Sequence, residues 1–229
     1  MARSNLMSRS GATSVSSSTP DSTRSRAEKR DLILAAAIKV FATNGYHGSR
    51  VSDIAREAGI AYGLVYHYFK NKEEILATIF EDRWSGFLEA VTDIAGSRAS
   101  TEERLLSLAV LVLGGFRRRP EWVKVLVLEI QRSSRFAEPS QLRAVGRLFD
   151  LVEGILREGQ ERGELRADLD PGVAVYVFMG ALDMVITTLV LGVMRIEGGE
   201  RHEREYYVKV ARNVVEIFLH GLAAEECNT

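Results

Sequence analysis

The residues best suited to chemistry form a polar and aromatic set between positions 50 and 72. Tyr66 and His67 can donate hydrogen bonds to phosphate oxygens, and Lys72 adds positive charge where a helix begins. Gly63 has no side chain and would allow close approach to the edges of bases. Neighbouring Phe69 is a core aromatic, and Tyr68 fits either a core or a surface role. These types and this spacing indicate contacts with a nucleic acid.

No pattern of residues in the chain indicates catalysis or metal binding. The four histidines are scattered, without the spacing of metal ligands, and no G-x-S-x-G motif is present. The single cysteine, Cys227, excludes an internal disulfide and fits a reducing compartment. We therefore expect a cytoplasmic protein that is not an enzyme and that holds no metal and no cofactor.

Two short helices must position the polar and aromatic set. Residues 51–69 read VSDIAREAGIAYGLVYHYF, and Gly59 supplies a turn between two helical stretches, the first of which Ser49 can cap. Small and branched apolar residues fall on the inward face of both helices: Val51, Ile54, Ala55, Ala58, Ile60 and Val65. The pattern predicts a helix-turn-helix whose second helix enters the major groove of DNA.

The remaining sequence predicts helices alone, so the fold class is all-α. Residues 1–27 are rich in Ser and Thr and are expected to form a disordered tail, followed by a DNA-binding domain over 28–71 and a ligand-binding and dimerisation domain over 72–229. Asn71 can cap a long helix over 72–95. Further helices are expected over 101–118, 121–134, 139–162, 171–195 and 203–224.

Charge and hydropathy separate a basic head from an acidic body. Residues 1–72 contain 11 Lys/Arg and 5 Asp/Glu, whereas residues 73–229 contain 19 and 26. A basic head favours an anionic partner such as double-stranded DNA. The apolar run over 173–194 is long enough for a membrane span, but Asp183 in its middle argues against one. We expect that helix and the last one to pair with a second copy in a homodimer.

The segment AAAIKVFATNGYHGSRVSDIAREAGIAYGLVYHYFKNKEEIL resembles the N-terminal domain of the TetR family of transcriptional regulators. The resemblance covers about residues 28–80, with NGY, IAxxAGI, GxVYHYF and KxKEEIL in order. It implies a three-helix DNA-binding domain, a divergent helical ligand domain, and a homodimer that represses transcription until a small molecule binds. Ala61 and Leu64 depart from the family, which often has Ser and Thr there. The implied DNA contacts are Arg50, Ser52, Tyr62, Gly63, Tyr66, His67 and Lys72.

The larger domain combines aromatic residues with clusters of arginine. Apolar side chains recur at helical spacing along 84–91 and 105–116, and most of them are core. An apolar cavity that opens at arginine side chains would suit an amphiphile with an anionic head. Residues 117–119 are all arginine, and they lie at the end of the helix predicted over 101–118. The candidate ligand-binding residues are Trp84, Phe87, Phe116, Trp122, Glu129, Arg132, Arg135, Phe149, Phe178 and Asp183.

The segments LVLEIQRSS, GILREGQERGEL and FMGALDMVITTLVL are similar to the FadR-type members of the family, which sense long-chain acyl-coenzyme A. This resemblance implies an acyl chain in the apolar interior and phosphates at surface arginines. It predicts a repressor of fatty-acid degradation that an acyl-CoA effector releases from a palindromic operator. A repressor that senses drugs or other lipophilic aromatic compounds is the alternative, and a DNA-binding module without a small ligand is a further one.

Overall fold

The computed structural model describes residues 20–130, 139–194 and 200–220, with side chains over 25–128, 142–194 and 204–220. Within these ranges the regular elements are helices, as expected. In chain order they are α1 (Pro20–Asn44), α2 (Val51–Glu57), α3 (Tyr62–Val65), α4 (Lys72–Ala95), α5 (Thr101–Arg118), α6 (Pro120–Val125), the π-helix η1 (Leu126–Ile130), α7 (Pro139–Glu161), α8 (Pro171–Val190) and α9 (Glu200–His220).

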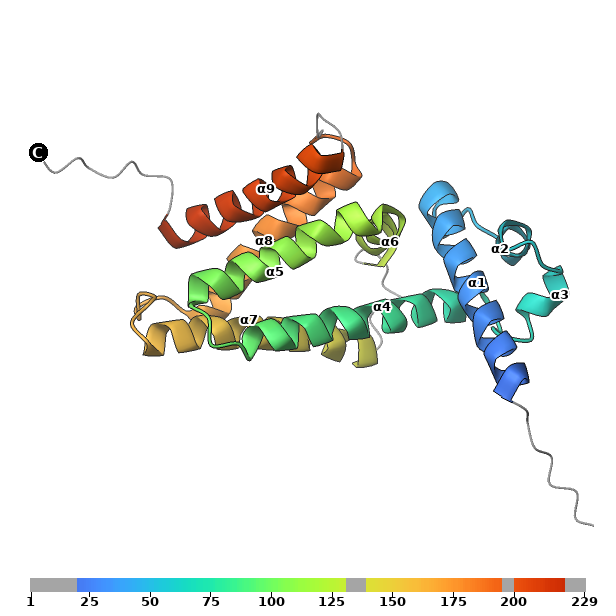
Figure 1. The fold of residues 1–229 in the computed structure, drawn as a ribbon, viewed down its shortest axis with the longest axis horizontal. Coiled ribbons are helices and arrows are strands. Elements are labelled where there is room, and N and C mark those ends of the chain that lie inside the picture. Colours follow the sequence, from blue (N-terminus) through green and yellow to red (C-terminus); the bar gives the residue numbers. More distant parts are fainter. Residues whose placement is uncertain (1–19, 131–138, 195–199, 221–229) are drawn as a thin grey trace, which may run out of the picture.

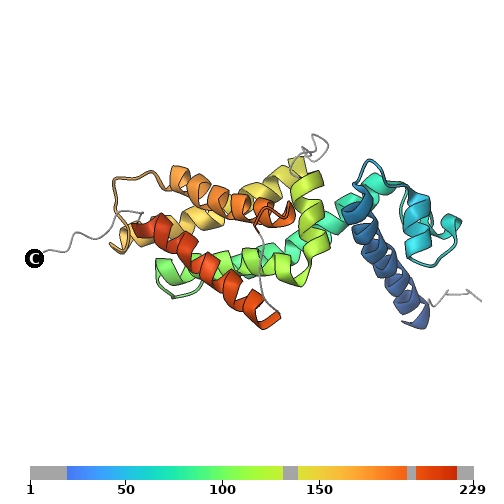
Figure 2. The same cartoon turned by 90° about the horizontal axis from the view of Figure 1, so that it is seen from above.

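The helices form a small head and a larger body that are joined by α4. The head consists of α1, α2 and α3 at one end of the molecule, and α4 runs from it along the body (Figure 1). In the body, α5 packs along α9, and α7 packs between α4 and α8. α6 reaches back to contact α1, so the head meets the body at two places. Figure 2 shows the same division from above.

Side-chain caps explain where the long helices begin. The Asn71 side chain accepts a hydrogen bond from the N–H of Glu74 at 2.8 Å and starts α4. Ser100 and Glu103 cap α5 reciprocally, since each side chain accepts a hydrogen bond from the other's backbone N–H. Asp170 caps α8 just before Pro171, whose missing N–H costs nothing in the first turn. These caps fix α4 and α5 at the boundaries that the sequence predicts.

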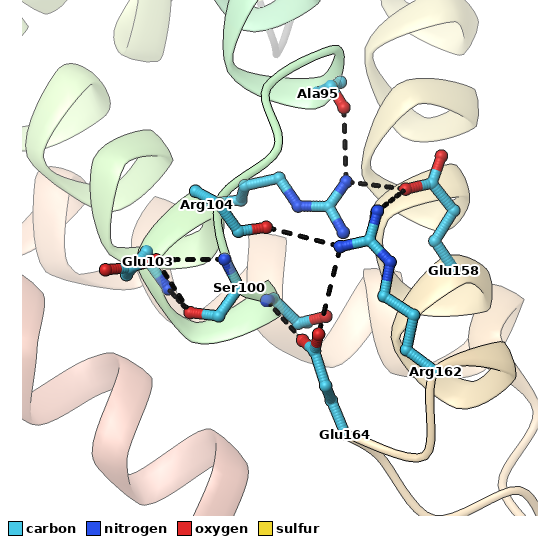
Figure 3. A network of polar contacts seen from close by, with 9 residues as sticks. Ala95, Ser100, Glu103, Arg104, Glu158, Arg162 and Glu164 are labelled. Carbon is cyan, nitrogen blue, oxygen red and sulfur yellow. Dashed lines mark hydrogen bonds and ion pairs between the residues drawn. The ribbon is translucent and has the colours of Figure 1, made fainter.

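A buried arginine joins three elements at the end of the body that lies far from the head. Arg104 of α5 is 1% exposed, and its Nη1 donates to the carbonyl of Ala95 at 3.2 Å and to Glu158 of α7 at 2.9 Å. Arg162 donates to the same Glu158 oxygen at 3.2 Å, and the Glu164 carboxylate accepts from the first N–H of α5 at 2.6 Å (Figure 3). The ends of α4, α5 and α7 are therefore fixed to one another.

The structure differs from the sequence expectation at several helix ends. α1 begins at Pro20, so part of the predicted tail 1–27 is helical, and a proline is well tolerated in the first turn. The predicted helix over 121–134 divides at Leu126 into α6 and the π-helix, and 131–134 lie outside the described residues. Ser49 does not cap α2. Its hydroxyl instead lies 2.6 Å from the Gly45 carbonyl, and Arg50 precedes the helix.

α8 has one buried face and one exposed apolar face. Phe178, Leu182 and Ile186 point into the body, whereas Val173, Tyr176, Val177 and Met184 are each about 60% exposed or more. In the described residues α8 is the one helix that is long and apolar enough to cross a membrane, by length and composition alone. Asp183 is exposed in its middle.

Candidate nucleic-acid interface and effector domain

Tight packing of α2 against the chain before α3 sets the position of α3. Ile54 and Val65 are fully buried, and Ala55 is 3% exposed where its small side chain permits a close approach. Gly59 has a φ of 66°, a left-handed conformation that glycine adopts readily. Its turn lets the N–H of Ile60 donate to the carbonyl of Ala55 at 3.0 Å. The two helices therefore form the predicted helix-turn-helix, and the outward side of α3 is left in solvent.

Two tyrosines form a pair on the outward side of α3. The hydroxyls of Tyr62 and Tyr66 lie 2.9 Å apart, and their rings meet edge to face with centroids 5.2 Å apart. Both side chains are about half exposed, although aromatic side chains are usually buried when packing alone governs them. The hydrogen bond that the Tyr66 hydroxyl shares with Tyr62 is the main cause that raises the pKa of Tyr66, because it favours the protonated phenol.

Lys72 lies differently from what the sequence suggests. Its ammonium donates to the carbonyls of Tyr46 and Ser49, at 2.7 and 3.0 Å, and lies 4.4 Å from the centre of the Tyr46 ring. The side chain is half-buried, and these contacts join the start of α4 to the turn between α1 and α2. An ammonium has three N–H donors, so one remains for a phosphate oxygen.

The other predicted DNA contacts are exposed on the same two helices or next to them. Arg50 precedes α2, Ser52 lies in its first turn, and His67 follows α3. Gly63 is informative because a Cβ atom built there would meet no protein atom within 4 Å. The fold does not need a glycine at this position, so its small size is available to a partner. The structure leaves these residues exposed on or beside α2 and α3, and their contacts with DNA stay a prediction.

The predicted ligand residues do not gather at one point. Trp84 stacks on Phe80, touches Phe87 and donates from its indole N–H to a carbonyl of α7 at 3.1 Å. The other predicted aromatics lie between different helix pairs, with ring contacts from Phe116 to Tyr207, from Phe149 to Tyr176 and from Phe178 to Phe218. They line the interfaces of α4 with α7, α5 with α9, α7 with α8 and α8 with α9. Trp122 is buried in α6.

Of the four polar residues predicted to bind the ligand, only one has a side chain among the described residues. Arg132 and Arg135 lie outside the described residues, as does the side chain of Glu129. Asp183 is exposed on α8, on the side away from the buried Phe178. A role for these four residues in ligand binding stays a prediction.

Two arginines that sequence reasoning missed occupy apolar stripes of their helices. Arg83 lies between Phe80 and Phe87 at the i+3 and i+4 spacing of the inward face of α4, and it is half-buried. Arg104 stands four residues before the buried Leu108 on α5, and it is buried. A charge that falls within a helical apolar stripe is the signal that would have identified both.

Comparison with known proteins assigns both parts of the chain. Residues 33–79 match the family described as bacterial regulatory proteins, tetR family, and residues 80–215 match the family described as YsiA-like protein, C-terminal region. The chain is 31% identical over 193 residues to a fatty acid metabolism regulator protein of Bacillus subtilis (strain 168). The aligned region covers 83% of this chain and 93% of the relative.

Two solved structures share the whole arrangement of helices. One is the FadR regulator of Bacillus subtilis in complex with stearoyl-CoA, with a TM-score of 0.72 and 29% identity over 84% of this chain and 99% of that one. The other is the fatty acid degradation regulator FadR from Bacillus halodurans, with a TM-score of 0.74 and 27% identity over 86% of this chain and 97% of that one. The likeness therefore extends over head and body together.

Proposed function

Because the chain belongs to the TetR family of bacterial regulatory proteins, we propose that it is a cytoplasmic repressor of fatty-acid degradation genes that long-chain acyl-CoA releases from its operator. The observation that carries this proposal is the likeness, over 84% of this chain, to the FadR regulator of Bacillus subtilis, whose structure is a complex with stearoyl-CoA. Aromatic side chains lie between four pairs of helices in the body, and the buried ones, Phe80, Phe178 and Tyr207, support an apolar environment for an acyl chain.

A homodimer is part of this proposal, and the exposed face of α8 supports it. Val173, Tyr176, Val177 and Met184 form an apolar stripe along this helix, and Ile217 of α9 is about half exposed as well. An exposed apolar stripe of this length is typical of an association surface. A two-fold axis along it would place two copies of α8 and α9 in one four-helix bundle. Light scattering at micromolar concentration should give the mass of a dimer, and a monomer would contradict the assignment.

The dimer defines how the operator is read. Two α3 helices about 34–36 Å apart would enter successive major grooves of a palindromic site. The exposed Tyr62–Tyr66 pair and Gly63 face outward for this purpose. Because phosphate contacts release counterions, we expect the operator affinity to fall steeply as salt is raised.

An operator titration tests the effector. We expect palmitoyl-CoA to weaken operator binding about 5- to 150-fold, the usual range of allosteric coupling. Free coenzyme A and a detergent of the same chain length serve as controls and should leave the affinity unchanged. If palmitoyl-CoA has no effect, or the detergent acts equally, the acyl-CoA assignment is wrong. A repressor of drug-like or aromatic compounds then becomes the better explanation.

A further inference from the structure

A cavity lies where the DNA-binding head meets the body at α6. It has a volume of about 290 Å³, and its walls come from the last turn of α1, from α6 and from η1. Figure 1 shows α6 reaching toward α1 at this place. The cavity is thus bounded by one helix of the head and two successive helices of the body, so a molecule inside it would touch both parts.

The apolar walls of the cavity belong to the packed core. Phe41 and Ala42 line it from α1, whereas Val125 and Leu128 line it from the body. The first three are buried, and Leu128 packs against the same core. Leu128 stands on η1, and a π-helix is a rare conformation that frequently occurs at functional sites. Apolar walls at a contact between domains are a usual setting for a small ligand.

The polar side chains that line the cavity are hydrogen-bond donors. Thr43 and Asn44 have a hydroxyl and an amide at the end of α1, and Lys124 has an ammonium on α6. Among the lysines that the structure describes, Lys72 and Lys124 are half-buried. Lys72 donates to two carbonyls, whereas Lys124 makes no hydrogen bond or ion pair with the described residues. A half-buried cation without an acceptor is costly, so an anionic partner would stabilise it.

An unpaired ammonium beside apolar walls matches a carboxylate on a short apolar chain. Carboxylate oxygens accept hydrogen bonds from all three kinds of donor, and the hydrogen bond to the ammonium is the strongest. The C-terminal end of α1 has a partial negative charge of about half an elementary charge, which the full charge of Lys124 exceeds. We propose that the cavity is a second small-molecule site, for a short apolar carboxylate, and that its occupant alters the affinity of the head for DNA.

The volume of the cavity limits the size of the occupant. At about 30 Å³ for each water molecule, it would hold about ten of them. Octanoate has a similar number of non-hydrogen atoms, whereas palmitoyl-CoA is several times larger. The cavity is therefore distinct from the site of the effector proposed above, and its assignment does not depend on the identity of that effector.

The position of the cavity couples its occupant to the DNA-binding helices. Phe41 and Ala42 belong to α1, and α1 packs on α2 of the helix-turn-helix. An occupant gains its contacts only while head and body keep the shape of the cavity, so it favours this arrangement over others. Because such coupling is reciprocal, operator DNA must change the affinity for octanoate by the same factor as octanoate changes the affinity for the operator.

Octanoate and its neutral analogue octanol are the matched probes. Titrations followed by NMR would use the full chain saturated with palmitoyl-CoA, so that the effector site is occupied. We expect a dissociation constant for octanoate on the order of 1 mM, as suits a ligand of this size. Lys124→Met should weaken octanoate binding about 3- to 10-fold, because it removes a partly exposed charge, and should leave octanol binding unchanged. Lys209→Met is the control, because Lys209 is an exposed lysine of α9.

A second variant fills the cavity without changing its charge. Ala42→Leu should abolish the binding of both probes, because the larger side chain takes up the space beside Phe41. Octanoate should change the operator affinity of the wild type and leave that of Ala42→Leu unchanged. If Ala42→Leu fails to fold, the comparison of Lys124→Met with Lys209→Met decides the site by itself.

The outcomes separate this site from the effector assignment. If octanoate does not bind, or if palmitoyl-CoA displaces it, the second site is overturned. Equal octanoate affinities in Lys124→Met and Lys209→Met would overturn it as well. Octanoate binding without any change in operator affinity would overturn the coupling to DNA. If palmitoyl-CoA itself fails to bind, the proposed function is contradicted, and the two lysine variants still decide the cavity.

Discussion

Replacing Gly159 by alanine would probe a close contact between α7 and the first residue of α5. A Cβ atom at this buried position would lie 2.4 Å from the Oγ1 atom of Thr101 and 3.0 Å from a methyl carbon of Leu165. The Thr101 oxygen cannot move away easily, because it is attached directly to the Cβ of a residue that is 1% exposed. The Gly159→Ala variant must therefore shift one helix against the other.

The expected size of the effect follows from two opposing contributions. Alanine in place of glycine inside a helix stabilises it by about 1 kcal/mol, because glycine loses more backbone entropy on folding. Overpacking of a close contact costs about 1–3 kcal/mol. Gly154 lies on the same helix, and a Cβ built there meets nothing within 4 Å. Gly154→Ala should therefore stabilise the protein by about 1 kcal/mol, whereas Gly159→Ala should range from neutral to about 2 kcal/mol destabilised.

Urea denaturation would measure both variants, at one fixed protein concentration because dimer dissociation contributes to stability. The difference between them isolates the packing cost of about 1–3 kcal/mol, since the helix contribution is common to both. Thr101→Ala removes the obstructing oxygen, so the penalty of Gly159→Ala should shrink in that background. If Gly159→Ala were as stabilising as Gly154→Ala, the close contact between α5 and α7 would be refuted.

Three further predictions concern charge and ionisation. Glu158→Gln should lower the free energy of unfolding by about 1–3 kcal/mol, because the buried Arg104 guanidinium loses its carboxylate while Glu158 itself is half exposed; thermal denaturation equal to the wild type would contradict this. A backbone N–H of α5 holds the pKa of Glu164 below its ordinary value, so its stabilisation is present above the unfolded pKa of about 4.3 and is lost as pH falls through the folded pKa. Between neutral and acidic pH, the melting temperature of Glu164→Gln should accordingly fall less than that of the wild type. Parallel curves of melting temperature against pH would argue against the contact. Tyr62→Phe should move the titration of Tyr66 to lower pH, as followed by phenolate absorbance, and an unmoved titration would exclude the hydroxyl pair.

Local signals made much of the fold predictable from the sequence. Asn71 and the Ser100–Glu103 pair form caps within a few residues, so α4 and α5 begin where their residue types require. Pro139 and Pro171 likewise open their helices, because proline lacks the N–H that a first turn leaves unpaired. The helix-turn-helix was predictable for the same reason, since its turn and its inward face lie within twenty consecutive residues.

The effector domain was less predictable, because an apolar stripe identifies a buried face but not the helix that covers it. Phe116 and Phe149 were correctly expected to pack inward, yet they contact α9 and α8 instead of a common centre. The pairing of Arg104 with Glu158 spans 54 residues, and no local pattern specifies it.

The two hydrogen bonds of Lys72 make α4 a rigid connection between the DNA-binding helices and the body. Since its ammonium holds the carbonyls of Tyr46 and Ser49, the first turn of α4 and the DNA-binding helices move as one piece. At the opposite end Arg104 donates a hydrogen bond to the carbonyl of Ala95, which fixes that end of α4 in the body. Twenty-four helical residues span about 36 Å, so each degree of tilt displaces Lys72 by about 0.6 Å. A tilt of about three degrees would therefore displace the DNA-binding helices by about 2 Å.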